Sequence, residues 1–178
     1  MCQPLIKFHP HPAIITQVLR IFVKDKLHLG RQTTIRPMND KLIIYQILTR
    51  LFTNGNKYCV PNGTIEQNGC GKMNDITSHV LESIRSLGST HVWYTGIIEH
   101  ATKTDYSRFG IRHDNPYIVK GRAGSPYAIK DYYDIDPDLA VSVPDRMKEF
   151  EALVDRTHKA GLKVIIDFVP KPVDRQYN

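Results

Sequence analysis

The chain has 178 residues, which is enough for one domain with a sizeable core and crowded for two. Hydrophobic residues make up 41% and charged residues 24%, an ordinary globular composition that excludes a collagen-like or low-complexity chain. With 24 Lys and Arg against 18 Asp and Glu, the formal net charge is +6. The positive charges are scattered and form no basic block, so we expect no nucleic-acid partner.

Cysteine content and hydropathy argue against two further classes of protein, disulfide-rich proteins and membrane proteins. Cys2, Cys59 and Cys70 are too few for a disulfide framework. Cys59 and Cys70 are able to pair with each other, but two unpaired thiols are favoured. No stretch approaches the roughly 18 apolar residues of a membrane span, and segment 13–23 lacks the cleavage pattern of a signal peptide. We expect no membrane partner, and the sequence leaves compartment and oligomeric state open.

Residues 1–40 differ in pattern from the rest and are interpreted as an amino-terminal extension. Three prolines within the first twelve residues predict irregular structure, and apolar residues at helical spacing over 14–23 predict one short helix. His9 and His11 lie close together, but two histidines without a third ligand are weak evidence for a metal. We expect no metal there.

From residue 41 onward, predicted strands and helices alternate. Apolar runs rich in β-branched residues predict three strands, over 42–48, 91–97 and 162–169. Amphipathic spacing predicts a helix between the first two strands, with Asn74 as its N-cap, and a second helix that begins at Pro144 and ends before Gly161. This β-α-β-α-β order predicts an α/β fold with parallel strands.

The lengths of the connections indicate where function lies. The helix-to-strand connections are very short, whereas the strand-to-helix segments 49–73 and 99–142 are long. Both long loops leave the carboxyl ends of parallel strands, which is the functional face of parallel barrels and open α/β sheets. Loops of this length inside a compact domain are usually functional.

The second long loop, 99–142, is rich in aromatic and basic residues. Its tyrosines are Tyr106, Tyr117, Tyr127, Tyr132 and Tyr133. Aromatic rings between basic residues suit single-stranded nucleic acid, the C–H faces of sugar rings, or packing of the loop against the sheet. Asp134 to Asp138 resembles the start of a calcium loop, but Leu139 stands where such a loop needs glycine, so we expect no calcium there.

Asp167 stands at the end of the third predicted strand, where burying a lone carboxylate is costly. It should therefore have an arginine, lysine, metal or substrate partner, and a structural ion pair is the alternative to a functional role. No glycine-rich phosphate loop follows the first strand, and no serine elbow is present. The sequence thus argues against a nucleotide-binding fold.

Three segments resemble the alpha-amylase family, glycoside hydrolase family 13. They are KLIIYQILTRLF at 41–52, GSPYAIKDYYDID at 124–136 and GLKVIIDFVP at 161–170. The resemblance runs over about 41–173, in the family's order. It implies that residues 41–178 are the amino-terminal part of a catalytic (β/α)8 TIM barrel, a partial barrel with its first three strands and two long βα loops. It also implies action on α-glucans or α-glucosides, with carbohydrate as the partner.

The resemblance assigns two substrate-binding residues. Tyr127 resembles the tyrosine that stacks on the sugar next to the cleaved bond, and Asp167 opens a motif that reads Asp-x-Val-x-Asn-His in the family. Lys171 and Pro172 stand at the Asn and His positions. That asparagine commonly binds calcium in the family, so the resemblance implies no metal and no cofactor in this chain.

The family's catalytic carboxylates lie on later strands, beyond residue 178. Retaining glycoside hydrolysis needs two carboxylates across the scissile bond, and a full barrel takes about 250 residues. We therefore expect no catalytic residue within this chain and no activity of it alone, as for a fragment or a disrupted reading frame. The alternative is a non-catalytic carbohydrate-binding or interaction fragment.

Overall fold

The computed structural model describes residues 41–169. The helix expected within 1–40, the histidines His9 and His11, and the departures Lys171 and Pro172 therefore lie outside the described residues.

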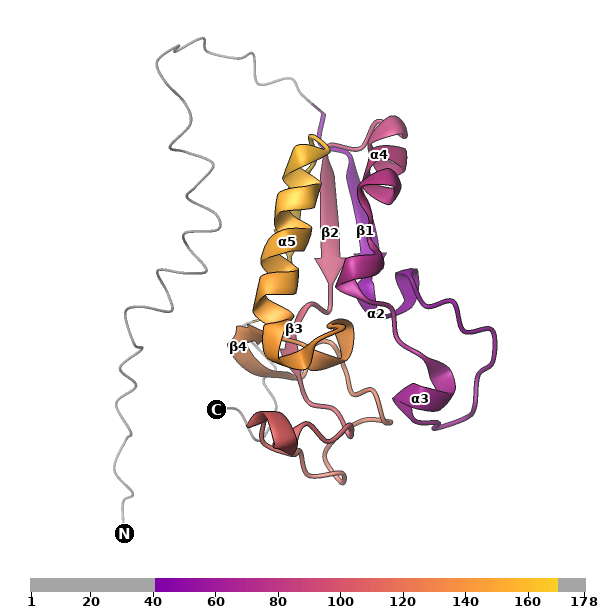
Figure 1. Ribbon diagram of the computed structural model, residues 1–178, viewed down its shortest axis with the longest axis vertical. Coiled ribbons are helices and arrows are strands. Elements are labelled where there is room, and N and C mark those ends of the chain that lie inside the picture. The colour runs from indigo at the N-terminus through magenta and orange to yellow at the C-terminus, as the bar shows by residue number, and fades with distance from the viewer. Residues whose placement is uncertain (1–40, 170–178) are drawn as a thin grey trace, which may run out of the picture. The chain divides into compact units, whose positions relative to one another are not determined.

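A three-stranded parallel sheet forms the centre of the described part (Figure 1). Its strands are β1 (Ile44–Leu48), β2 (His91–Thr95) and β5 (Lys163–Ile166). The spatial order is β1-β2-β5, and both pairings are parallel, as the sequence predicts. Each strand is shorter than its apolar run; in β1, for example, pairing begins only at Ile44, opposite His91.

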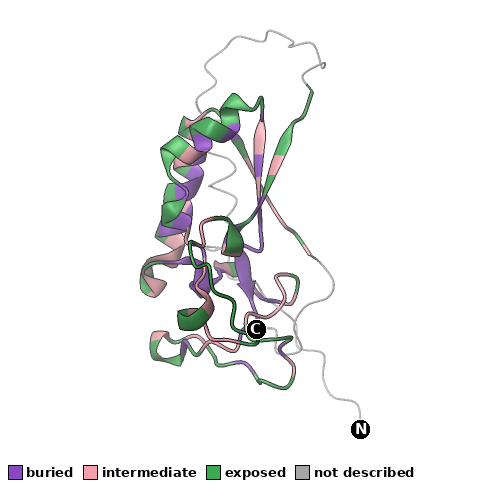
Figure 2. Cartoon of the chain, turned by 90° about the vertical axis from the view of Figure 1, so that its right-hand side faces the viewer, coloured by how far each residue is buried: buried purple, intermediate pink, exposed green. Residues whose placement is uncertain are grey.

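Two helices supply the crossovers, α4 (Ser78–Ser86) and α5 (Arg146–Lys159). One face of α5 is buried and the other exposed (Figure 2), as its amphipathic spacing predicts. The Tyr94 hydroxyl of β2 lies 2.7 Å from the Thr157 hydroxyl of α5, and burial raises the pKa of Tyr94 to about 12. This buried contact fixes α5 against the sheet.

The start of α4 corrects one prediction. Asn74 is not the N-cap, because it lies inside the 3-10 turn η2 (Met73–Asp75). Thr77 caps the helix instead, and its hydroxyl accepts a hydrogen bond from the Val80 N–H at 3.4 Å. Met73 and Ile76 are fully buried, so the chain must first enter the core before it can turn into the helix.

Both long loops contain short helices or strands that the sequence pattern does not predict. The first holds α2 (Thr49–Phe52) and α3 (Ile65–Asn68), and the second holds β3 (Ile98–His100) and β4 (Ile129–Ile135). β3 and β4 pair antiparallel in a separate small sheet with an irregular register. The second loop also holds the 3-10 turns η3 (Ser107–Phe109) and η4 (Pro137–Leu139). A further turn, η5 (Val143–Asp145), contains Pro144, so α5 begins at Arg146 and not at Pro144 as predicted.

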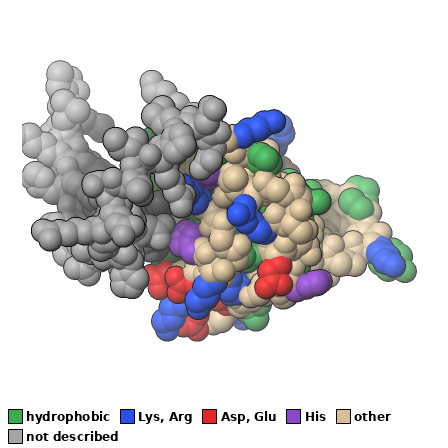
Figure 3. Space-filling model, turned by 90° about the horizontal axis from the view of Figure 1, so that it is seen from above, with side chains coloured by type: hydrophobic (Ala, Val, Ile, Leu, Met, Phe, Trp, Pro, Cys, Tyr) green, Lys and Arg blue, Asp and Glu red, His purple; other side chains and the backbone are tan. Residues whose placement is uncertain are grey.

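The described residues present mixed charge on one face. On the face seen from above, basic and acidic side chains lie among each other and do not gather by sign (Figure 3). Within residues 41–169, no helix has both the length and the apolar character that a membrane crossing requires.

Candidate functional site

Asp167 follows β5 directly, at the carboxyl end of the sheet. Its Oδ1 accepts a hydrogen bond from the Trp93 indole N–H at 2.9 Å, and its Oδ2 accepts one from the Gly96 backbone N–H at 3.1 Å. Within the described residues its hydrogen-bond partners are thus two neutral donors rather than an arginine or lysine, and the metal or substrate partner that the sequence also allows stays a prediction. These donors solvate the carboxylate and fix its orientation.

Tyr127 is brought to the same end of the sheet. Gly96 ends β2 with a left-handed φ of +72°, and a Cβ at this position would lie 2.9 Å from the Pro126 Cβ. The glycine therefore lets the segment that carries Tyr127 pass closely over the end of β2. Tyr127 remains 43% exposed, and Asp167 accepts its hydrogen bond from the backbone N–H of the same glycine.

Some tyrosine side chains of the second loop pack against other residues, and others are exposed to solvent. Tyr106 is buried and donates to Asp138 Oδ1 at 2.6 Å, while the ring of Tyr132 packs on Phe168 with centroids 5.6 Å apart. For these two residues, packing explains the aromatic content. Tyr117 and Tyr127 are the more exposed members, at 95% and 43%.

A buried ionic network joins the two long loops beneath this end of the sheet. The Arg50 guanidinium donates twice to Asp138 Oδ2, and Tyr106 donates to the other oxygen of the same carboxylate. The Lys72 ammonium donates to the Asp138 carbonyl at 2.7 Å. Asp138 itself is fully buried, so removing one partner would leave a costly buried charge.

Asp136 and His100 form a second buried pair. His100 Nδ1 lies 3.5 Å from Asp136 Oδ2, and Asp136 Oδ1 accepts from the Asp138 N–H at 3.0 Å. Burial raises the pKa of Asp136 to about 6, with the neighbouring His100 acting in the opposite direction. The pair braces β3 against the segment that follows β4.

Lys130 is the centre of a third buried cluster. Its ammonium lies 3.5 Å from Glu99 Oε1 and 3.2 Å from Asp114 Oδ1, and it donates to the Arg112 carbonyl. Burial raises the pKa of Glu99 to about 7, although Lys130 partly opposes this shift. The cluster connects β3, β4 and the segment between them, and no local sequence pattern predicts it.

The three carboxylates of the calcium-like segment point to different partners. Asp134 pairs with Arg146, Asp136 with His100, and Asp138 with Arg50. Within residues 41–169, no group of three or more potential ligands comes together around a common point. Cys59 and Cys70 are both free thiols, as favoured from the sequence.

A family model describes the same stretch of chain. Residues 46–175 match the model "Alpha amylase, catalytic domain". The match begins within β1 and continues through both long loops, β2 and β5, and it includes Tyr127 and Asp167.

The chain is also similar to individual proteins over most of its length. The chain is 29% identical to trehalose-6-phosphate hydrolase of Bacillus subtilis over 140 residues, covering 78% of this chain and 18% of that protein. It is 26% identical to a cyclomaltodextrin glucanotransferase of Geobacillus stearothermophilus, covering 72% and 17%. Among solved structures, the trehalose-6-phosphate hydrolase of Bacillus licheniformis aligns over 80% of this chain and 19% of its own, with 25% identity and a TM-score of 0.49. The chain thus spans less than a fifth of the length of these relatives.

Proposed function

The chain belongs to the alpha-amylase family, and we propose that it forms the amino-terminal part of a glycoside hydrolase acting on α-glucans or other α-glucosides. The observation that carries the proposal is the family match over 46–175. The names of relatives support the substrate class, because they include a trehalose-6-phosphate hydrolase and the maltase A1 of Drosophila melanogaster.

Tyr127 and Asp167 are the substrate-contacting residues of this proposal. Both are linked to Gly96 at the carboxyl end of β2: Asp167 accepts from its N–H, and Pro126, the residue before Tyr127, lies next to it. The partly exposed Tyr127 ring would pack on a sugar ring, and the Asp167 carboxylate, held by Trp93 and Gly96, would accept a hydrogen bond from a sugar hydroxyl. No metal or other cofactor takes part in these roles.

The reaction itself needs residues that the family places after these 178. Retaining hydrolysis requires an acid and a nucleophile about 5–5.5 Å apart, both of them carboxylic. We propose that these 178 residues supply substrate contacts and no catalytic carboxylate, so that they do not hydrolyse glycosides alone.

Reducing-sugar release from maltooligosaccharides tests the proposal. The measurement compares the 178-residue chain with a version extended by the five remaining strands of a relative. Release by the extended enzyme and none by the chain alone is the expected result. Failure of a folded extended enzyme to act on any α-glucoside would contradict it.

A non-catalytic role is the second candidate. The chain is 30% identical over 127 residues to the mouse protein named amino acid transporter heavy chain SLC3A1, so one relative carries a name that is not an enzyme's. Lys171 and Pro172 also depart from the family's motif. Retention of the chain on amylose without any sugar release, even after extension, would favour this candidate.

A further inference from the structure

His100, the last residue of β3, is a buried histidine outside the proposed pair of substrate contacts. It is 4% exposed, and both of its ring nitrogens face oxygen atoms. Nε2 lies 3.2 Å from the Ala123 carbonyl oxygen, and Nδ1 lies 3.3 Å from the Ile98 carbonyl oxygen and 3.5 Å from Asp136 Oδ2. Ala123 lies four residues before Tyr127, so the ring joins β3 to the segment that carries the proposed sugar-stacking residue.

We propose that His100 is a positioning residue that works as an imidazolium cation: it holds Ala123 by a hydrogen bond and so places Tyr127 over the end of β2. The inference rests on the proposed function, because it explains how the proposed substrate contact is held in place. It adds to the candidate site a residue that itself touches no substrate.

The acceptors around the ring require a proton on each ring nitrogen. Carbonyl oxygens only accept hydrogen bonds, whereas a neutral imidazole carries one N–H and leaves its other nitrogen as an acceptor. A neutral ring would therefore direct a nitrogen lone pair at the Ala123 oxygen or at the Ile98 oxygen. With both nitrogens protonated, each carbonyl oxygen faces a donor.

The Asp136 carboxylate compensates the charge of the buried ring. Its Oδ2 has no hydrogen bond within residues 41–169, and His100 Nδ1 faces it at 3.5 Å. Burial raises the pKa of Asp136 to about 6; His100 acts in the opposite direction, Asp138 raises this pKa further and Arg50 lowers it. The carboxyl group is therefore mostly ionised at neutral pH. A cation and an anion are buried together, which costs less than burying either charge alone.

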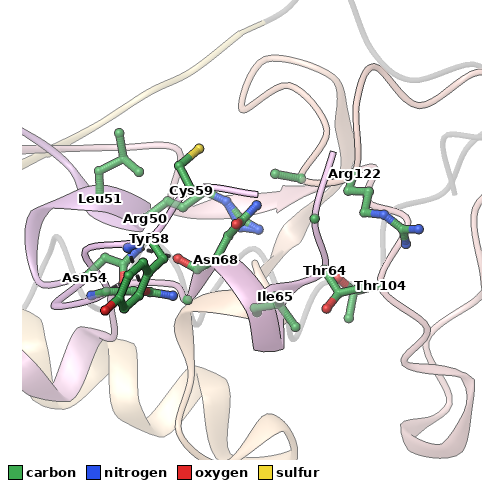
Figure 4. Close-up of a pocket in the computed structure, with 14 residues that line it drawn as sticks. Arg50, Leu51, Asn54, Tyr58, Cys59, Thr64, Ile65, Asn68, Thr104 and Arg122 are labelled. Atoms are coloured by element: carbon green, nitrogen blue, oxygen red, sulfur yellow. Dashed lines mark hydrogen bonds between the residues drawn. The ribbon is translucent and has the colours of Figure 1, made fainter. Parts of the chain in front are cut away.

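Arg122, the residue before Ala123, anchors the start of the segment. Its Nε donates to the Asn62 carbonyl of the first long loop at 2.7 Å, and its own carbonyl accepts from the Lys103 N–H at 2.9 Å. Figure 4 shows Arg122 and Thr104 on the same side of the pocket that lies between the two long loops. The chain therefore reaches Ala123 from a fixed point.

The turn that carries Tyr127 is held at both of its ends. The Ala128 N–H donates to the Ser125 carbonyl at 2.9 Å and closes the turn, while the Ala128 carbonyl accepts from the Ala101 N–H at 3.0 Å. At the other end, Gly124 has a left-handed φ of +75°, and a Cβ there would clash with the Ala101 carbonyl oxygen. The backbone thus lies directly against the end of β3, and the histidine contact just before this glycine fixes the entry into the turn.

Solid-state NMR of the full chain, labelled at the histidine ring nitrogens, tests the charge of the ring, and it suits self-associated protein as well as monomers. His100→Gln and His100→Asn identify the His100 signals by their loss. We expect both ring nitrogens to carry a proton at neutral pH, and Asp136→Asn should leave only one of them protonated. A neutral ring in the wild-type chain, including one that accepts a proton from Asp136, would overturn the inference. A ring that stays doubly protonated in Asp136→Asn would overturn the choice of counter-ion.

Deuterium exchange of the full chain tests the placing of segment 122–128. His100→Leu keeps an apolar side chain but cannot donate, so exchange in this segment should rise about tenfold while α5 stays protected. His100→Gln can still donate and should exchange more slowly than the leucine variant. His91→Leu is the matched control, because His91 opens β2 at the opposite end of the sheet, and it should leave the segment unchanged. Equal exchange in the wild type and His100→Leu would overturn the inference.

Kinetics of the extended enzyme connect this placing to turnover. His100→Leu should lower turnover roughly tenfold, but it should have little further effect once Tyr127→Ala is present, because both changes act on the same ring contact. Equal effects in the two backgrounds would overturn the positioning role. An extended enzyme without activity on any α-glucoside would instead contradict the proposed function, while NMR and exchange decide separately whether His100 is charged and holds the segment.

Discussion

Removing Asp167 should cost less stability than removing half of a buried ion pair. Asp167→Ala leaves the Trp93 and Gly96 N–H groups without their acceptor, which costs about 1–3 kcal/mol of unfolding free energy. Breaking a buried ion pair would cost about 3–5 kcal/mol. Urea unfolding of the extended enzyme measures the difference, and a loss in the higher range would point to a cation that the described residues do not contain.

Tyr127 should matter for turnover rather than for folding. Because Tyr127 is 43% exposed, Tyr127→Ala should cost less unfolding free energy than truncation of a fully buried core residue. If the ring positions the sugar, its loss should lower turnover on the order of a hundredfold. Turnover and melting temperature of the variant are measured together in the extended enzyme. A variant that unfolds while retaining its specific activity would reverse the assigned role.

Glu99 should give the protein a pH-dependent stability. Its pKa is raised from 4.5 to about 7 by burial, so the folded state binds the proton more tightly than the unfolded state. The stability from this group is therefore complete below pH 4.5 and is lost as pH rises toward 7. Glutamine at position 99 cannot ionise, so Glu99→Gln should reduce the change of the urea unfolding midpoint with pH over this range. Glu82 is exposed, so Glu82→Gln should keep the wild-type dependence on pH. Equal slopes in all three proteins would contradict the assignment.

The residues of the candidate site differ in how far the sequence predicts them. Tyr127 and Asp167 follow from family resemblance, and the strand pattern places Asp167 at the end of a strand. Their contacts with Pro126, Trp93 and Gly96 depend on how distant segments meet in space, which no local pattern encodes. The same holds for Lys130, whose two carboxylate partners come from other parts of the second loop.

At the scale of elements, the start of α4 offers a direct test of capping. Thr77→Ala removes the side-chain acceptor for the Val80 N–H and should cost about 0.5–2 kcal/mol of unfolding free energy. Asn74→Ala is the matched control and should cost less, because Asn74 precedes the cap in a 3-10 turn. Urea unfolding of the two variants measures both costs. A larger cost for Asn74→Ala than for Thr77→Ala would indicate that Asn74 is the N-cap after all.

The regular elements were predictable because each has a strong period. Continuous apolar runs predict β1, β2 and β5, and the spacing of Phe150, Leu153 and Thr157 predicts the buried face of α5. The strands β3 and β4 have no such signal. β3 has only three residues, the two strands lie far apart in the sequence, and they carry the buried charges of Glu99 and Lys130. Tertiary ion pairing, rather than local pattern, makes this small sheet.

At the scale of the whole molecule, the three-stranded sheet is covered unequally. The α5 side of β2 is fully buried, as Val92 and Tyr94 show. In contrast, β1 is exposed along most of its length, with Ile44 at 48% and Leu48 at 42% (Figure 2). Among the described strands, β1 and β5 each pair only with β2, so both outer edges carry unpaired backbone groups.

This exposed sheet should make the 178-residue chain self-associate and bind a hydrophobic dye such as ANS. Apolar side chains and unpaired strand edges are both left open to water, and each favours contact with a second apolar surface. Ile44→Lys should reduce dye fluorescence and shift light scattering toward the monomer, because it places a charge on the exposed strand. Val141→Lys is the control, since that residue is 66% exposed but lies outside the sheet, and it should leave both signals unchanged. A wild-type chain that is monodisperse, monomeric and free of dye binding would show that the exposed face of β1 is shielded in solution.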